Sequence, residues 1–166
     1  MKVDLSQMSY AVISDCGKYR YWLHRRWATG KGWLVFVMLN PSTADGLAND
    51  ATLRRCIGFA QAFGYKGVIV VNMFAARSRY PDALRDMDDP VGPENDEYIT
   101  AACEMASRVV VAWGADRMTK RRWRTVIRII KDAGALPTCF GTTNRGEPLH
   151  PLYIAAGTKL KVYENA

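Results

Sequence analysis

Residues 33–45 read Trp33-Leu-Val-Phe-Val-Met-Leu-Asn-Pro-Ser-Thr-Ala-Asp45, an apolar run that stops at Asn40 and Pro41. A run of this length, rich in branched and aromatic residues, predicts a strand buried on both faces of a sheet. Pro41 has no N–H to donate to a neighbouring strand, so the strand ends there. Asn40 then lies at the carboxyl end of a central parallel strand, where open α/β sheets bind ligands. The alternative is that Asn-Pro-Ser forms only a turn.

The composition fits one globular domain. The chain has 166 residues, of which 49% are hydrophobic and 23% charged, and this is enough to bury a core. We treat residues 1–166 as a single α/β domain in which residues 1–30 form an N-terminal hairpin extension. No apolar run has the length of a membrane span or of a signal peptide. We therefore expect a cytoplasmic protein with no membrane partner.

The cysteines and the net charge indicate which kinds of ligand and partner to expect. The four cysteines lie far apart without a Cys-x-x-Cys pair, so we expect reduced thiols, no metal site and no cofactor. The formal net charge of +7 permits a nucleic-acid partner. The sequence carries no signal for the oligomeric state.

Further apolar runs alternate with helical patterns along the chain. Residues 8–27 predict a hairpin of mixed basic and aromatic residues, which either grips phosphates and bases or packs an aromatic face on the core and leaves a solvated basic face. Helices are predicted from about Asp50, Pro93 and Arg117. Strands are predicted at 33–39, 67–72, 108–113 and 136–140. These elements predict a three-layer α/β/α domain around a central, mainly parallel, four-stranded sheet.

The predicted helix of residues 117–133 is strongly basic. No acidic residue lies between Asp116 and Asp132. Five basic residues at three- and four-residue spacing form one stripe: Arg117, Arg121, Arg124, Arg128 and Lys131. Such a stripe is either a solvated helix face or a surface that binds the phosphates of a nucleic acid.

Four short motifs, in this order, resemble the uracil-DNA glycosylase superfamily. They are Asn40-Pro41-Ser42 after the first strand, Asn72 at the end of the second, residues 109–114 in the third, and His150-Pro-Leu-Tyr153 near the end. The resemblance implies a uracil-DNA glycosylase-like fold with the strand order 2-1-3-4. The sequence departs from the superfamily pattern at two places. Met38 and Ser42 replace glycines of the first motif, and Leu152-Tyr153 replaces the Ser-Pro of the closing motif.

The same resemblance implies roles for individual residues. Asn40 positions the attacking water, Asn72 reads the edge of the base, and His150 supports the negative charge on the leaving base. Ser42 lies at the rim of this site.

An amide is not a general base, so a nearby carboxylate is a candidate for that task. Asp45 and Asp50 are the candidates, and their alternative roles are a turn residue and a helix cap, respectively. A flipped base also needs an aromatic platform, for which Phe74 is the candidate.

A longer set of motifs resembles a family of bacterial and phage proteins of unknown function. The matching segments are 38–45, 49–56, 70–75, 92–96 and 150–153. Together the resemblances predict an enzyme of DNA repair or modification that acts on a nucleobase–sugar bond, in DNA or in a nucleotide. The alternative is a non-catalytic nucleic-acid or nucleotide-binding protein that retains the pocket.

Overall fold

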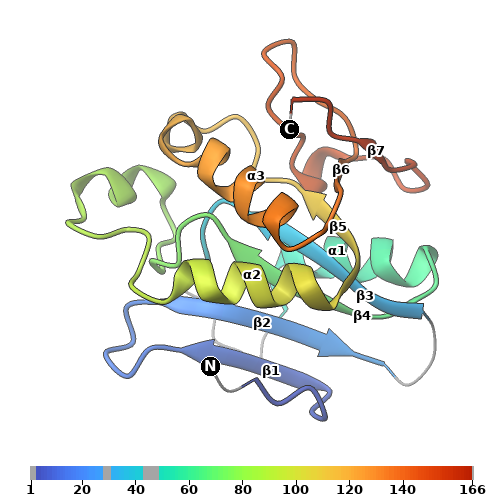
Figure 1. Cartoon of the computed structure of the whole chain (residues 1–166), viewed down its shortest axis with the longest axis horizontal. Coiled ribbons are helices and arrows are strands. Elements are labelled where there is room, and N and C mark those ends of the chain that lie inside the picture. The colour runs from blue at the N-terminus through green and yellow to red at the C-terminus, as the bar shows by residue number, and fades with distance from the viewer. Residues whose placement is uncertain (1–2, 28–30, 43–48, 166) are drawn as a thin grey trace.

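The computed structural model describes residues 3–27, 31–42 and 49–165, which form one sheet with helices on both faces (Figure 1). The seven strands of the described residues pair in the order β1-β2-β4-β3-β5-β6-β7. The strands are β1 (Ser9–Ile13), β2 (Arg20–Arg26), β3 (Lys31–Met38), β4 (Tyr65–Asn72), β5 (Ala106–Val111), β6 (Pro137–Cys139) and β7 (Lys161–Val162). The α-helices are α1 (Ala51–Ala62), α2 (Asn95–Met105) and α3 (Trp123–Asp132), and the 3₁₀ helices are η1 (Pro81–Asp86), η2 (Arg117–Arg121) and η3 (Pro151–Tyr153).

Strand β3 is the central strand of the sheet. It pairs in parallel with β4 on one side and with β5 on the other. Its side chains alternate between two cores, since Leu34, Phe36 and Met38 pack with α1 whereas Val35 and Val37 pack with α2 and α3. Residues 34–37 have no exposed surface, which confirms the predicted burial on both faces.

The prediction of an α/β fold is confirmed, but the prediction of a four-stranded sheet is wrong. The four predicted strands are present as β3, β4, β5 and β6, and neighbouring members of this group pair in parallel. Strands β1, β2 and β7 extend the sheet through antiparallel pairings. The sheet is therefore mixed and seven-stranded. Strand β7 has two residues, which is too short to give a pattern in the sequence.

The helices cover both faces of the sheet and produce three layers. Helix α1 packs on one face, and α2 and α3 lie side by side on the other (Figure 1). In the described part of the chain, no helix is both long enough and apolar enough to cross a membrane.

The N-terminal hairpin forms part of the sheet. Strand β2 pairs with β1 on one side and with β4 on the other. Tyr21, Trp22 and Leu23 are buried, and so are the basic side chains of Arg20 and Arg25. The interpretation of a solvated basic face is therefore wrong for this strand. Because β2 runs antiparallel to β4, its first residue, Arg20, lies beside the carboxyl end of β4.

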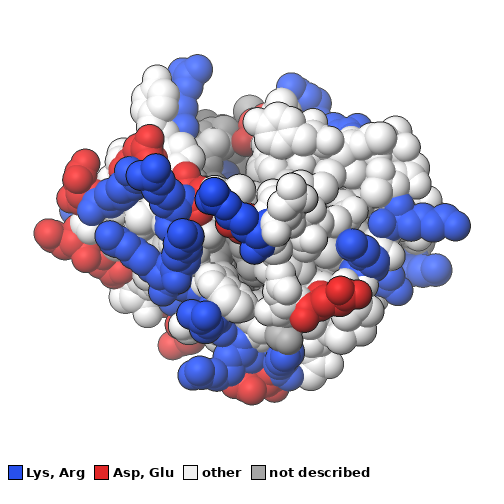
Figure 2. Space-filling model, turned by 90° about the horizontal axis from the view of Figure 1, so that it is seen from above, with Lys and Arg blue, Asp and Glu red and all other residues white. Residues whose placement is uncertain are grey.

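The basic segment after β5 is not the continuous helix that the spacing predicts. It forms η2 and α3, which are separated at Arg122, where φ is −137° and ψ is −19°. The Arg122 guanidinium donates to the Met73 carbonyl oxygen (2.6 Å) and pairs with the Asp96 carboxylate. The five basic residues of the predicted stripe are exposed. Figure 2 shows Lys and Arg side chains spread over several parts of one face of the molecule, with Asp and Glu among them.

Candidate functional site

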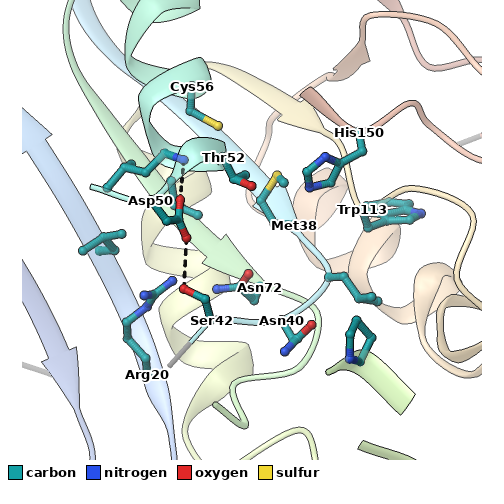
Figure 3. A pocket seen from close by; sticks show the side chains of 15 residues that line it. Arg20, Met38, Asn40, Ser42, Asp50, Thr52, Cys56, Asn72, Trp113 and His150 are labelled. Carbon is teal, nitrogen blue, oxygen red and sulfur yellow. Dashed lines mark hydrogen bonds between the residues drawn. The ribbon is translucent and has the colours of Figure 1, made fainter. Parts of the chain in front are cut away.

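A cavity of about 210 Å³ opens at the carboxyl ends of β3 and β4. Asn40, Asn72 and His150, which the sequence predicts at one cleft, line it together, with Ser42 and Asp50 beside them (Figure 3). The full lining consists of Arg20, Leu23, Met38, Leu39, Asn40, Ser42, Asp50, Thr52, Leu53, Cys56, Val70, Asn72, Pro81, Trp113 and His150.

Asn40 follows β3 and has a fixed amide orientation. Its Nδ2 donates to the carbonyl oxygens of Ser78 (2.9 Å) and Pro41 (3.1 Å). Both amide hydrogens are therefore engaged by the backbone of neighbouring loops. The Oδ1 oxygen is left as the group with which Asn40 can orient a water molecule or a ligand donor.

Asn72 is the last residue of β4 and pairs in register with Met38 of β3. Its side chain is 2% exposed, and among the described residues its Nδ2 atom has no hydrogen-bond partner. The backbone beside it is fixed, because Asn95 of α2 donates to the carbonyl oxygens of Asn72 and Met73 (both 3.0 Å). A buried amide without a partner costs about 1–3 kcal/mol, so this donor is available to a ligand in the cavity.

His150 is held at the start of η3 in a defined tautomer. Its Nδ1 accepts from the Leu152 N–H (3.3 Å), which leaves Nε2 as the nitrogen that carries the proton. Burial lowers the pKa of His150, and the negative charge of Asp50 opposes this shift. His150 is therefore a neutral hydrogen-bond donor at neutral pH.

The turn that carries His150 is fixed by α1. The Arg55 guanidinium donates to the carbonyl oxygens of Pro151 (3.4 Å) and Ile154. Arg55 is thus a positioning residue for His150, and it lies outside the set of residues predicted for the site. No local sequence pattern indicates this role, because the residues whose carbonyl oxygens Arg55 contacts lie 96 and 99 residues further along the chain.

Asp50 caps α1 and also faces the cavity. One carboxylate oxygen accepts from the Leu53 N–H (2.7 Å), which confirms the predicted helix cap. The other accepts from the Ser42 hydroxyl (2.9 Å), a bond drawn in Figure 3. The cap therefore holds a carboxylate and a serine hydroxyl in fixed positions at the cavity wall.

Arg20 lines the cavity although the sequence did not single it out as a site residue. It is 5% exposed, and burial lowers the pKa of its guanidinium to about 10 while the Asp50 charge opposes that shift. The side chain is therefore still a cation at neutral pH. The sequence shows Arg20 only as one of several basic residues in the hairpin, and its place follows from the antiparallel pairing of β2 with β4.

One of the predicted site residues, Phe74, does not join this cavity. Phe74 is 2% exposed in the core with α2 and α3 and is absent from the lining, so its prediction as a base platform is wrong. The aromatic side chain that lines the cavity is Trp113, which the glycosylase resemblance placed in the third strand. Asp45 lies outside the described residues.

The basic stripe is separate from the cavity, since none of its five residues is part of the lining. Among the described residues, the salt bridges are Arg85–Asp82 and Arg122–Asp96. The stripe residues are thus exposed cations that form no salt bridge with an acidic side chain in the described part of the chain.

A family model described as "Protein of unknown function (DUF1643)" matches residues 20–152. The match spans most of the chain and includes every lining residue of the cavity. No curated protein and no solved structure matches the chain. None of these results links the chain to the uracil-DNA glycosylase superfamily.

Charge reversal of the stripe tests its role. Changing Arg121, Arg124 and Arg128 to Glu should weaken binding of DNA or RNA and make its salt dependence shallower, because fewer counterions are released. Titrations of a labelled oligonucleotide by fluorescence anisotropy at several salt concentrations measure both quantities. Unchanged affinity with an unchanged salt slope would identify the stripe as a solvated surface.

Proposed function

We propose that this chain, which belongs to the DUF1643 family, hydrolyses the bond between a nucleobase and its sugar, with DNA as the expected partner. The observation that carries the proposal is the convergence of Asn40, Asn72 and His150 on one open cavity. These side chains come from segments far apart in the sequence. One of them, Asn72, is buried and its Nδ2 has no hydrogen-bond partner among the described residues, which supports a ligand site over an accidental surface pocket.

Base recognition is assigned to Asn72. An amide offers both a donor and an acceptor, which is what the edge of a nucleobase requires. The Nδ2 of Asn72 has no partner among the described residues, so a carbonyl or ring nitrogen of the base would satisfy it. The cavity of about 210 Å³ is smaller than the roughly 300–1,000 Å³ of sites for drug-sized molecules. This volume favours entry of the base alone, with sugar and phosphate outside.

Departure of the base is assigned to His150. Breaking an N-glycosidic bond develops negative charge on the base and positive charge on the sugar. The neutral imidazole donates from Nε2, so it can stabilise an oxygen of the departing base without first losing a proton. Its orientation is fixed in advance by the Leu152 N–H and by the Arg55 contacts to η3. A donor held in place in this way needs little reorganisation as the charge develops.

Attack by water is assigned to Asn40 and Asp50. The Oδ1 of Asn40 can orient a water molecule but cannot remove its proton. The Asp50 carboxylate lines the same cavity and can stabilise the positive charge that develops on the sugar. Both of its oxygens already accept hydrogen bonds, which weakens it as a general base. We therefore expect slow catalysis.

Because Asp50 is a weak general base, a second candidate function is binding without catalysis. A protein with the same cavity and no effective base would bind a nucleobase or nucleotide without cleaving it. Asn72 would then serve recognition alone. The two functions differ in one result, the appearance of abasic sites in the substrate.

The first test is a screen for base release. Purified protein is incubated with labelled oligonucleotides that carry varied and modified bases, and abasic sites are scored. On a substrate that is cleaved, Asn40→Ala and His150→Ala should each lower the rate by about 10²–10³, the range for losing one preorganised hydrogen-bonding group. Binding should change far less, because the other contacts remain.

Asn144→Ala is the matched control, because Asn144 is exposed and lies outside the cavity lining, and it should retain the wild-type rate. If wild type releases no base while cavity variants lose affinity, the binding function replaces the enzymatic one. If wild type releases no base and the Asn40, Asn72 and His150 variants all lose thermal stability, the cavity is a structural polar network.

The pH dependence of base release tests the state of His150. Burial lowers its pKa from the ordinary value of 6.5, so the neutral, active form should persist to a more acidic pH than for an exposed histidine. Base release should stay constant from pH 8 down to about pH 6.5 and fall only below that range, as protonation of Nδ1 breaks the Leu152 contact. A rate that rises as the pH falls from 8 to 6 would contradict the assignment of a neutral donor.

A further inference from the structure

A second cavity, of about 370 Å³, adjoins the first and shares Trp113 with it. We call it the strand groove. Its walls come from η2, the start of α3, the loop before His150 and the C-terminal segment. The lining residues are Trp113, Thr119, Lys120, Trp123, Arg145, Gly146, Glu147, Tyr163 and Asn165.

Specific side-chain contacts fix the walls of the strand groove. The Tyr163 hydroxyl and the Asn165 Nδ2 both donate to the Gly146 carbonyl oxygen (2.9 Å each). The Tyr163 ring also meets Trp113 edge-on, with ring centroids 6.1 Å apart. These contacts fix the C-terminal segment against the loop and against the wall that the two cavities share.

The chemistry of the strand groove combines cations with an aromatic face. Lys120 and Arg145 are exposed in it, and Trp123, which lines it with them, is half-buried. The Arg124 guanidinium lies over the Trp123 ring, 4.8 Å from its centroid. The one acidic side chain in the described lining, Glu147, accepts a hydrogen bond from Thr143. Cations interleaved with aromatic rings are the pattern that binds phosphates and stacked bases.

The volume of the first cavity indicates which parts of a nucleic acid would lie in the strand groove. If the first cavity takes a base alone, the sugar, the phosphates and the neighbouring nucleotides must lie outside it. The strand groove is the adjoining surface with cations for those phosphates. Stacking on Trp123 also requires an exposed base face, which an unpaired strand offers and the interior of a duplex does not.

We infer that the strand groove binds the nucleotides next to the target base, and that the substrate is a single-stranded nucleic acid. Lys120 and Arg145 contact its phosphates, and Trp123 stacks a neighbouring base. This inference rests on the proposed function for the choice of the first cavity as the base site. It assigns the substrate class, a polynucleotide strand, in place of a free nucleotide or a duplex.

Binding of labelled 12-nucleotide single strands, measured by fluorescence anisotropy at several salt concentrations, tests the phosphate contacts. The double variant Lys120→Ala/Arg145→Ala should weaken binding at least tenfold and reduce the salt slope by about 1.4, because each lost phosphate contact on a single strand removes about 0.7. Lys159→Ala/Lys161→Ala is the control with the same change in charge. Both of its sites are exposed and lie outside the strand groove, and it should change the slope far less.

Trp123 provides the second arm of this experiment. Trp123→Ala should lose about tenfold in affinity for the single strand, the order expected for one stacked base, and Trp123→Phe should recover most of it. A duplex of the same sequence should bind more weakly than the strand and respond less to Trp123→Ala. DNA and RNA strands are compared to identify the sugar.

Either of two results would overturn the inference. In the first, Lys120→Ala/Arg145→Ala has the same affinity and salt slope as the control Lys159→Ala/Lys161→Ala. In the second, the duplex binds more tightly than the single strand. The proposed function is tested separately. Base release by wild type with no effect of the strand-groove variants would reject the groove and keep the enzyme. Selective loss of strand binding without base release would reject the enzyme and keep the groove.

Discussion

The parallel pairing of β3 with β4 is the constraint on which the site depends. Its register sets Met38 opposite Asn72, so that Asn40, two residues beyond Met38, leaves the sheet at the edge where β4 ends. Both strands are buried on both faces, and a slip of one residue would exchange their two cores. The packing that stabilises the fold therefore also fixes where the two asparagines lie.

The cavity contains a polar group that does not serve the stability of the fold in an obvious way. The Asn72 side chain is 2% exposed, and its Nδ2 atom has no partner among the described residues. A group of this kind is costly unless something binds to it. By contrast, Asn95 and Arg55 donate hydrogen bonds to backbone carbonyl oxygens and so fix the backbone around the site. This division between positioning groups and available groups is typical of a binding site.

The sequence predicted the parts of the fold that depend on local pattern. Apolar runs identified β3, β4, β5 and β6 within a few residues, and Asp50 was recognised as a possible helix cap. The convergence of Asn40, Asn72 and His150 could be predicted because parallel strands place their carboxyl ends at one edge. The strand order came from the resemblance to a superfamily and not from the pattern itself.

The features that the sequence missed depend on tertiary contacts. Pairing of β2 with β4 brings Arg20 to the cavity, and nothing in a local window indicates that partner. The break at Arg122 follows from its bonds to Met73 and Asp96, which override helical spacing. Phe74 follows a strand end as Asn40 does, yet its side chain turns into the core. The residues next to Phe74 in the sequence do not indicate the direction of its side chain.

The side-chain amide of Asn72 gives the most direct test of the central claim, that the cavity holds a nucleobase. Free pyrimidine and purine bases are titrated into ¹⁵N-labelled protein, and the Nδ2 signals are assigned by their loss in Asn72→Asp. At least one base should produce a saturable shift of these two proton signals, since a buried donor without a partner among the described residues acquires one. Signals that stay unchanged with every base, while exposed amides respond only weakly and without saturation, would contradict it.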